Sequence, residues 1–175
     1  VAMIWIDAHP DLGVAGDDFY KGYHAMAVSA LVGDKTLIDE FALPAHIKPQ
    51  NVLFIGLNSN EAQHYNDRRE SLGIQAIWGK DIVENEAKAL SAIRAWVAQS
   101  RAKKVLIHLD LDVLNPKDLY IAVGDSGILS TAQVVSAINA VSQNAEVVGL
   151  TIAEHLPKTE IKLKELISKL PLIRG

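Results

Sequence analysis

Three side chains that commonly bind metal ions follow one apolar segment near the start of the chain. Residues 1–6 form an apolar run that predicts a buried β-strand, and Asp7, His9 and Asp11 come directly after it. At positions i, i+2 and i+4 of an extended or turning chain, these side chains can project to one side and converge. Two carboxylates held that close repel unless a proton or a cation neutralises them. The pattern fits a bound dication, and it also fits a strand that ends in a solvated Asp turn.

A second apolar run, residues 105–109, contains His108 and ends in two further carboxylates, Asp110 and Asp112. In open parallel sheets, functional sites form at the carboxyl ends of the strands, and both clusters follow strand ends. Together they offer four carboxylates and one imidazole. This oxygen-rich set favours manganese, or another hard-to-borderline metal pair, over a thiolate zinc site. So many carboxylates also favour two ions a few Å apart over one.

The composition limits the class of protein. The chain has 175 residues, enough for one domain, and is 49% hydrophobic with a net charge of −4. The weak acidic balance does not indicate a nucleic-acid or anionic-membrane partner. The absence of cysteine excludes disulfides and thiolate ligands. Because there is no run long enough to cross a bilayer and no signal-peptide pattern, we expect a cytoplasmic protein.

Apolar strands alternate with amphipathic helices along most of the chain. This alternation predicts an α/β fold, a three-layer α/β/α sandwich with a mostly parallel sheet, formed by a single domain over residues 1–175. Because the first strand starts at Val1 with nothing before it, we expect that domain to be N-terminally incomplete. The expected strands are 1–6, 51–57, 74–78, 105–109 and 146–152, and the expected helices are 25–32, 61–72, 84–99, 131–142 and 159–170.

Three motifs in this order resemble those of the ureohydrolases, the family of arginase, agmatinase and formiminoglutamase. Residues 7–11 (D-A-H-P-D) match the family's D-A-H-x-D, and residues 110–116 (D-L-D-V-L-N-P) are similar to its D-x-D-x-x-D-P. Residues 151–154 (T-I-A-E) resemble a variant of its late D-[ILV]-x-E. The resemblance covers nearly the whole chain, and it implies an arginase-like fold.

The resemblance also implies a ligand set for two manganese ions per active site, with Asp7 and Asp110 bridging them. The implied ligands are Asp7, His9, Asp11, Asp110 and Asp112. The family has one more ligand, an early histidine in a G-G-D-H motif, which has no counterpart in these 175 residues.

Further residues receive catalytic and substrate-binding roles from the resemblance. His24 matches a proton shuttle or acid, Glu154 matches the glutamate that meets the substrate's guanidinium, and Asp11 would accept a hydrogen bond from the attacking hydroxide and carry a proton. Glu61 lies about where a family aspartate contacts the substrate, although an acidic residue at a helix N-terminus is the simpler explanation. Leu156 stands where arginases have asparagine, which disfavours arginine itself as the substrate.

The function that the resemblance implies is hydrolysis of a guanidino or formimino compound. A hydroxide bridging two manganese ions would attack the C–N carbon and release urea or formamide. The expected partners are a small-molecule substrate and further copies of the chain in a homo-oligomer. Two alternatives stay open: a single-zinc deacetylase-like amidohydrolase on a related fold, and an inactive or truncated family member with a structural or regulatory role. The missing early histidine favours the second, whereas Asp11 and Asp112 argue against the first.

Overall fold

The computed structural model describes residues 1–17, 22–60, 62–121, 127–156 and 160–172. Five strands form one sheet in the order β3-β2-β1-β4-β5, and every neighbouring pair is parallel. The α/β class and the parallel sheet predicted from the sequence are therefore confirmed. The strands are β1 (Ala2–Ile6), β2 (Val52–Leu57), β3 (Gln75–Trp78), β4 (Lys104–Asp110) and β5 (Glu146–Ala153).

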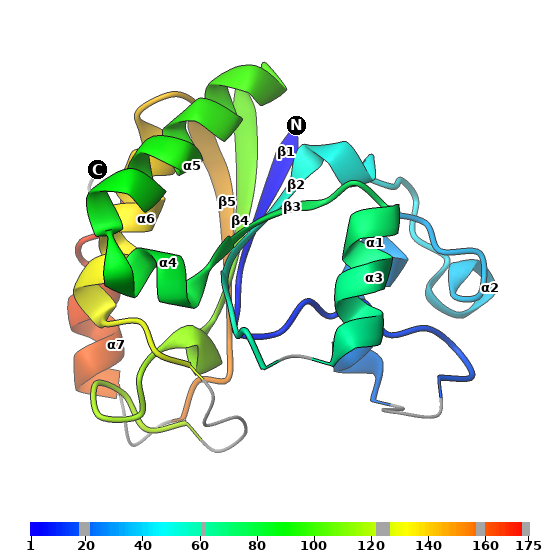
Figure 1. Cartoon of the computed structure of the whole chain (residues 1–175), viewed down its shortest axis with the longest axis horizontal. Coiled ribbons are helices and arrows are strands. Elements are labelled where there is room, and N and C mark those ends of the chain that lie inside the picture. The colour runs from blue at the N-terminus through cyan, green and yellow to red at the C-terminus, as the bar shows by residue number, and fades with distance from the viewer. Residues whose placement is uncertain (18–21, 61, 122–126, 157–159, 173–175) are drawn as a thin grey trace.

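Helices cover both faces of this sheet, so the fold has three layers (Figure 1). In Figure 1, α1, α2 and α3 lie on one side of the strands and α4 to α7 on the other. The α-helices are α1 (Ala27–Leu31), α2 (Ile38–Phe41), α3 (Gln63–Ser71), α4 (Gly79–Glu84), α5 (Glu86–Ser100), α6 (Thr131–Ser142) and α7 (Glu160–Ile167). Three 3₁₀ turns complete the described elements: η1 (Tyr23–Met26), η2 (Pro49–Asn51) and η3 (Leu111–Val113).

The order of the strands places the two acidic clusters side by side. From β1 the chain runs outward through β2 to β3, and it then returns to pair β4 with the other edge of β1. The direction of winding thus changes between β1 and β4, where open α/β sheets bind their ligands at the carboxyl ends of the strands. Ile6 at the end of β1 pairs with Leu109 near the end of β4, so Asp7 and Asp110 follow at the same edge.

Alternation along β1 divides the core into two layers. Ile4 and Ile6 are fully buried in the cluster that α5, α6 and α7 complete. Trp5 points to the opposite face and packs with residues of β2, α1 and α3. Over β4 and β5 this second face is less covered, because Leu106 and Val148 are 39% and 40% exposed. His108 and Asp110, which lie on the same face at the end of β4, are half-buried.

Two of the expected helices differ from the prediction in more than their end residues. The helix expected over residues 84–99 is preceded by α4, and the two helices are separated at Asn85, whose side chain caps α5 by accepting a hydrogen bond from the Lys88 backbone N–H at 3.1 Å. The helix expected over residues 25–32 begins as the 3₁₀ turn η1. The short helix α2 carries no long apolar pattern and was not predicted. Within the described ranges, no helix is long and apolar enough to cross a membrane.

Candidate metal centre

Asp7 is a buried carboxylate at the centre of the site. Its side chain is almost inaccessible, and both oxygens accept hydrogen bonds, Oδ2 from Trp5 Nε1–H at 3.0 Å and Oδ1 from the His9 backbone N–H at 2.7 Å. Burial raises the pKa of Asp7 well above its ordinary value of 3.8; hydrogen bonding to His9 lowers it, and the charges of Asp11 and Asp112 raise it further. A carboxylate in this setting requires a cation beside it in order to ionise.

His9 supplies that positive charge when no metal is bound. Its Nδ1 lies 2.7 Å from Asp112 Oδ2 and 3.6 Å from Asp7 Oδ1. The hydrogen bond to Asp112, followed by that to Asp7, raises the pKa of His9 to about 11, although burial opposes the increase. Asp112 is itself fixed, because its Oδ1 accepts a hydrogen bond from the Ala8 backbone N–H at 3.2 Å. A metal ion bound by His9 must displace this proton.

Asp110 and His108 lie at the β4 end of the site. Asp110 Oδ1 accepts a hydrogen bond from the Asp112 backbone N–H at 2.9 Å. Burial raises the pKa of Asp110 to about 7, and the charges of Asp112 and Glu154 add to this increase. Burial lowers the pKa of His108 to about 4. The histidine is therefore neutral at pH 7, which is the form of imidazole that binds metals.

Two groups of side chains come close enough to hold metal ions. Asp7, His9 and Asp112 form one, and Asp7, His108 and Asp110 form the other; within each group, one potential ligand atom per residue lies within 4.8 Å of the rest. Asp7 belongs to both. The donors are carboxylate oxygens and imidazole nitrogens, and burial, together with the charges of the neighbouring carboxylates, raises the pKa of Asp7. These residues therefore fit a pair of hard-to-borderline dications.

Asp11 and Glu154 flank the two groups, but neither belongs to them. Asp11 has a φ of 47° and Glu154 a φ of 61°, a left-handed conformation that is uncommon outside glycine and that clusters at functional sites. The charge of Asp11 raises the pKa of Asp7, and the charge of Glu154 raises that of Asp110. Both carboxylates are thus near enough to the site to act on it electrostatically.

The remaining predicted residues lie outside the groups. His24 is exposed in η1, directly before α1. Glu61 lies outside the described residues. Four of the five predicted ligands, all but Asp11, thus come together in the two groups, and the role of all five as metal ligands stays a prediction.

Sequence reasoning missed His108, and with it two neighbours, Trp5 and Thr151. His108 precedes Asp110 by two residues on a strand, so both side chains face the same way. That spacing was a usable signal. Its neighbours could not be predicted in the same way, because they depend on which strands lie on either side of β4.

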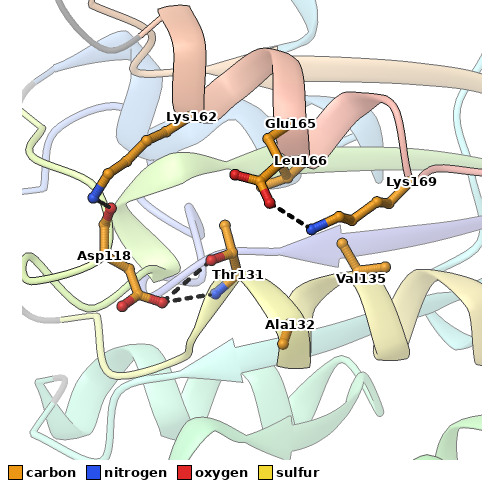
Figure 2. A pocket seen from close by; sticks show the side chains of 8 residues that line it. All are labelled: Asp118, Thr131, Ala132, Val135, Lys162, Glu165, Leu166 and Lys169. Atoms are coloured by element: carbon orange, nitrogen blue, oxygen red, sulfur yellow. Dashed lines mark hydrogen bonds and ion pairs between the residues drawn. The ribbon is translucent and has the colours of Figure 1, made fainter.

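A separate pocket of about 220 Å³ lies between the start of α6 and the helix α7 (Figure 2). Figure 2 shows that Asp118 caps α6 by accepting hydrogen bonds from the Thr131 backbone N–H at 3.0 Å and hydroxyl at 3.2 Å. Lys162 donates a hydrogen bond to the Asp118 carbonyl, and Lys169 pairs with Glu165. These contacts explain the polar groups of the pocket as parts of the packing between α6 and α7.

A sequence model of the arginase family matches residues 1–168. No curated protein matches the chain. The family match covers both acidic clusters and all five strands.

Solved structures of similar fold include arginases and a related enzyme. The arginase from Bacillus caldovelox is 22% identical with a TM-score of 0.84, covering 99% of this chain and 60% of its own. The arginase from Entamoeba histolytica, solved with L-ornithine, is 20% identical with a TM-score of 0.80, and the match covers 97% of this chain and 59% of that one. The formimidoylglutamase from Bacillus subtilis is 20% identical, with a TM-score of 0.74 and coverage of 96% and 51%. The chain thus spans about three fifths of the length of these arginases.

Proposed function

The chain belongs to the arginase family, and on that premise we propose that it is a two-manganese hydrolase of a guanidino or formimino compound. The observation that carries the proposal is the position of Asp7 in both candidate ligand groups. A carboxylate shared between two groups is suited to bridge two ions a few Å apart. A single-zinc amidohydrolase would need only one of these groups, so the shared carboxylate favours the two-ion centre.

The ligands follow from the two groups. We assign His9 and Asp112 to one ion and Asp7 to both. Asp110 belongs to the group of the other ion and, as the family motif implies, would also bridge, with Asp11 completing the set. Oxygen-rich donors with few imidazoles match manganese better than soft metals. When bound, such a pair of ions lowers the pKa of water and so supplies hydroxide near neutral pH.

The chain's other polar residues would bind the substrate and move protons. Glu154, which is half-buried and whose charge acts on Asp110, would bind a cationic guanidinium by charge-assisted hydrogen bonds. Asp11 would accept the proton that the nucleophile loses. His24, at the start of the α1 segment, would donate a proton to the leaving amine. Each of these roles is proposed on the family motif, and the positions of Asp11 and Glu154 near the ligand groups support two of them.

The proposed substrate is a small molecule with a planar cationic C–N centre. Arginases and a formimidoylglutamase share this fold, so both guanidino and formimino compounds belong in the panel of substrates to be tested. The homo-oligomer stays a prediction, as does the single domain.

The direct test is release of urea from guanidino compounds, or of formamide from formimino compounds, by manganese-loaded protein. We expect release that depends on manganese and is lost in Asp112→Ala. A manganese-loaded chain that holds two ions and releases neither product from any compound of the panel would overturn the enzymatic proposal. An exposed carboxylate on α3 provides the matched control, Asp67→Ala, which should retain activity.

A further inference from the structure

His108 faces the same side of the sheet as the two carboxylates at the strand ends. It precedes Asp110 by two residues on β4, and it pairs in register with Trp5 on β1, which precedes Asp7 by two residues. Because alternate residues of a strand share a face, His108, Asp7 and Asp110 converge. One potential ligand atom from each lies within 4.8 Å of the others. His108 therefore lies next to the proposed bridging carboxylate.

Two neighbours hold the imidazole ring in place. The ring stacks on Trp5 with the centroids 3.9 Å apart and the planes inclined by 21°. Its Nδ1 lies 2.7 Å from Oγ1 of Thr151, a residue of β5, which pairs with β4 on the side opposite β1. Trp5 also donates its Nε1–H to Asp7, so the same indole orients the ring and one of the carboxylates. A ring fixed on both sides is preorganised to bind a ligand.

The contact with Thr151 indicates which ring nitrogen is available. When Nδ1–H donates to the threonine hydroxyl, the lone pair of a neutral imidazole lies on Nε2. Among the described residues, Thr151 accounts for the hydrogen bonding of His108, and Nε2 is left for another partner. Histidines that bind metals commonly donate their second ring N–H to a nearby oxygen in this way.

We propose that His108 is a metal ligand that binds, through Nε2, the ion held between Asp7 and Asp110, and that Thr151 is the residue that orients its ring. This inference rests on the proposed two-metal function and extends it. The centre would then have one imidazole for each ion, His9 with Asp112 at one end and His108 with Asp110 at the other. A ligand at this position changes the donor set that the family motifs alone imply.

The test counts histidine nitrogens at the metals. Protein labelled with heavy nitrogen in its histidines is loaded with an NMR-active cadmium isotope, a diamagnetic probe for the manganese positions. We expect two ring nitrogens coupled to cadmium in the unchanged chain and one in His108→Gln. The control His46→Ala removes an exposed histidine and should keep both couplings. Two bound ions with cadmium coupled to His9 alone would overturn the proposal while leaving the two-metal function intact.

Thr151→Val supplies an independent variant that keeps the imidazole. Because loss of an orienting partner commonly weakens metal affinity about 10–100-fold, we expect the second manganese ion to bind more weakly by that factor in equilibrium dialysis. Unfolding curves in chelator should show that all variants fold. Unchanged affinity for both ions in Thr151→Val and His108→Gln would refute the assignment, whereas a chain that binds no second ion even unaltered would refute the two-metal function itself and this inference with it.

Discussion

Replacing Asp110 by asparagine separates two effects of the Asp110 carboxylate: the loss of stability that its charge causes in the metal-free protein, and its contribution to metal binding. The pKa of Asp110 is raised from 3.8 to about 7, first by burial and then by the charge of Asp112. A raised carboxyl pKa means that the folded state holds a proton that the unfolded state has lost. The contribution of Asp110 to the stability of the metal-free protein therefore falls as the pH rises from about 4 to about 7, and above pH 7 this loss is complete.

The magnitude follows from the difference in pKa. At about 1.36 kcal/mol for each pKa unit, an isolated group would cost about 4 kcal/mol above pH 7. Asp110 is partly exposed and interacts with other charges, so solvent screening reduces this figure, and we expect about 2 kcal/mol. The amide introduced by Asp110→Asn carries no charge, and its oxygen can still accept the hydrogen bond that the carboxylate takes from the Asp112 backbone N–H.

Urea unfolding in chelator between pH 4 and pH 8 measures the effect. The advantage of Asp110→Asn over the unchanged chain should be small at pH 4 and should level off near ~2 kcal/mol at pH 8. Saturating manganese should reverse the order, because an ion at 100 times its Kd stabilises the folded chain that binds it by about 2.7 kcal/mol. The exposed control Asp67→Asn should show neither effect. A difference that does not vary with pH, or an Asp110→Asn variant that binds both ions with unchanged affinity, would show that the reasoning is wrong.

Three further changes test other parts of the account. His9→Ala should lower the free energy of unfolding of the metal-free protein, and this deficit should be largest below pH 6.5 and shrink as the pH rises toward 11. The reason is that the raised pKa of His9 stabilises the fold only while the ring is protonated. Urea unfolding across this pH range measures the effect. Gly127→Ala would place a Cβ in steric overlap with the Asp112 carbonyl oxygen, so calorimetry should show a loss of about 1–3 kcal/mol and dialysis should show weaker manganese binding. Ser130→Ala removes the capping box that Ser130 and Gln133 form at α6 and should cost about 1 kcal/mol without changing manganese affinity.

The clusters at the ends of β1 and β4 were predictable because their signals are local. Each is an apolar strand followed by acids at alternate positions, and in a parallel sheet the strand ends lie at one edge. The match of the D-A-H-x-D motif then indicated the family, which the comparison over residues 1–168 confirms. The grouping of Asp7 with His9 and Asp112 depends only on these two strands being neighbours.

The second imidazole was missed although its spacing from Asp110 is a local signal, and the neighbours that orient its ring could not be predicted from such signals. His108 becomes a candidate ligand because β4 lies between β1 and β5, so that Trp5 and Thr151 hold its ring from either side. Apolar periodicity gives the strands but not their neighbours. The break at Asn85 between α4 and α5 escaped prediction for a related reason: a cap is a single side-chain contact, and the helical pattern continues across it.

The number of manganese ions per chain tests the central claim most directly. Metal analysis of the manganese-loaded chain, together with its electron paramagnetic resonance spectrum, measures both the stoichiometry and the distance-dependent coupling of the ions. We predict two ions per chain and the spectrum of a coupled pair, since Asp7 is shared by both ligand groups. One ion, or none, at saturating manganese, with no coupled spectrum, would contradict the two-metal centre.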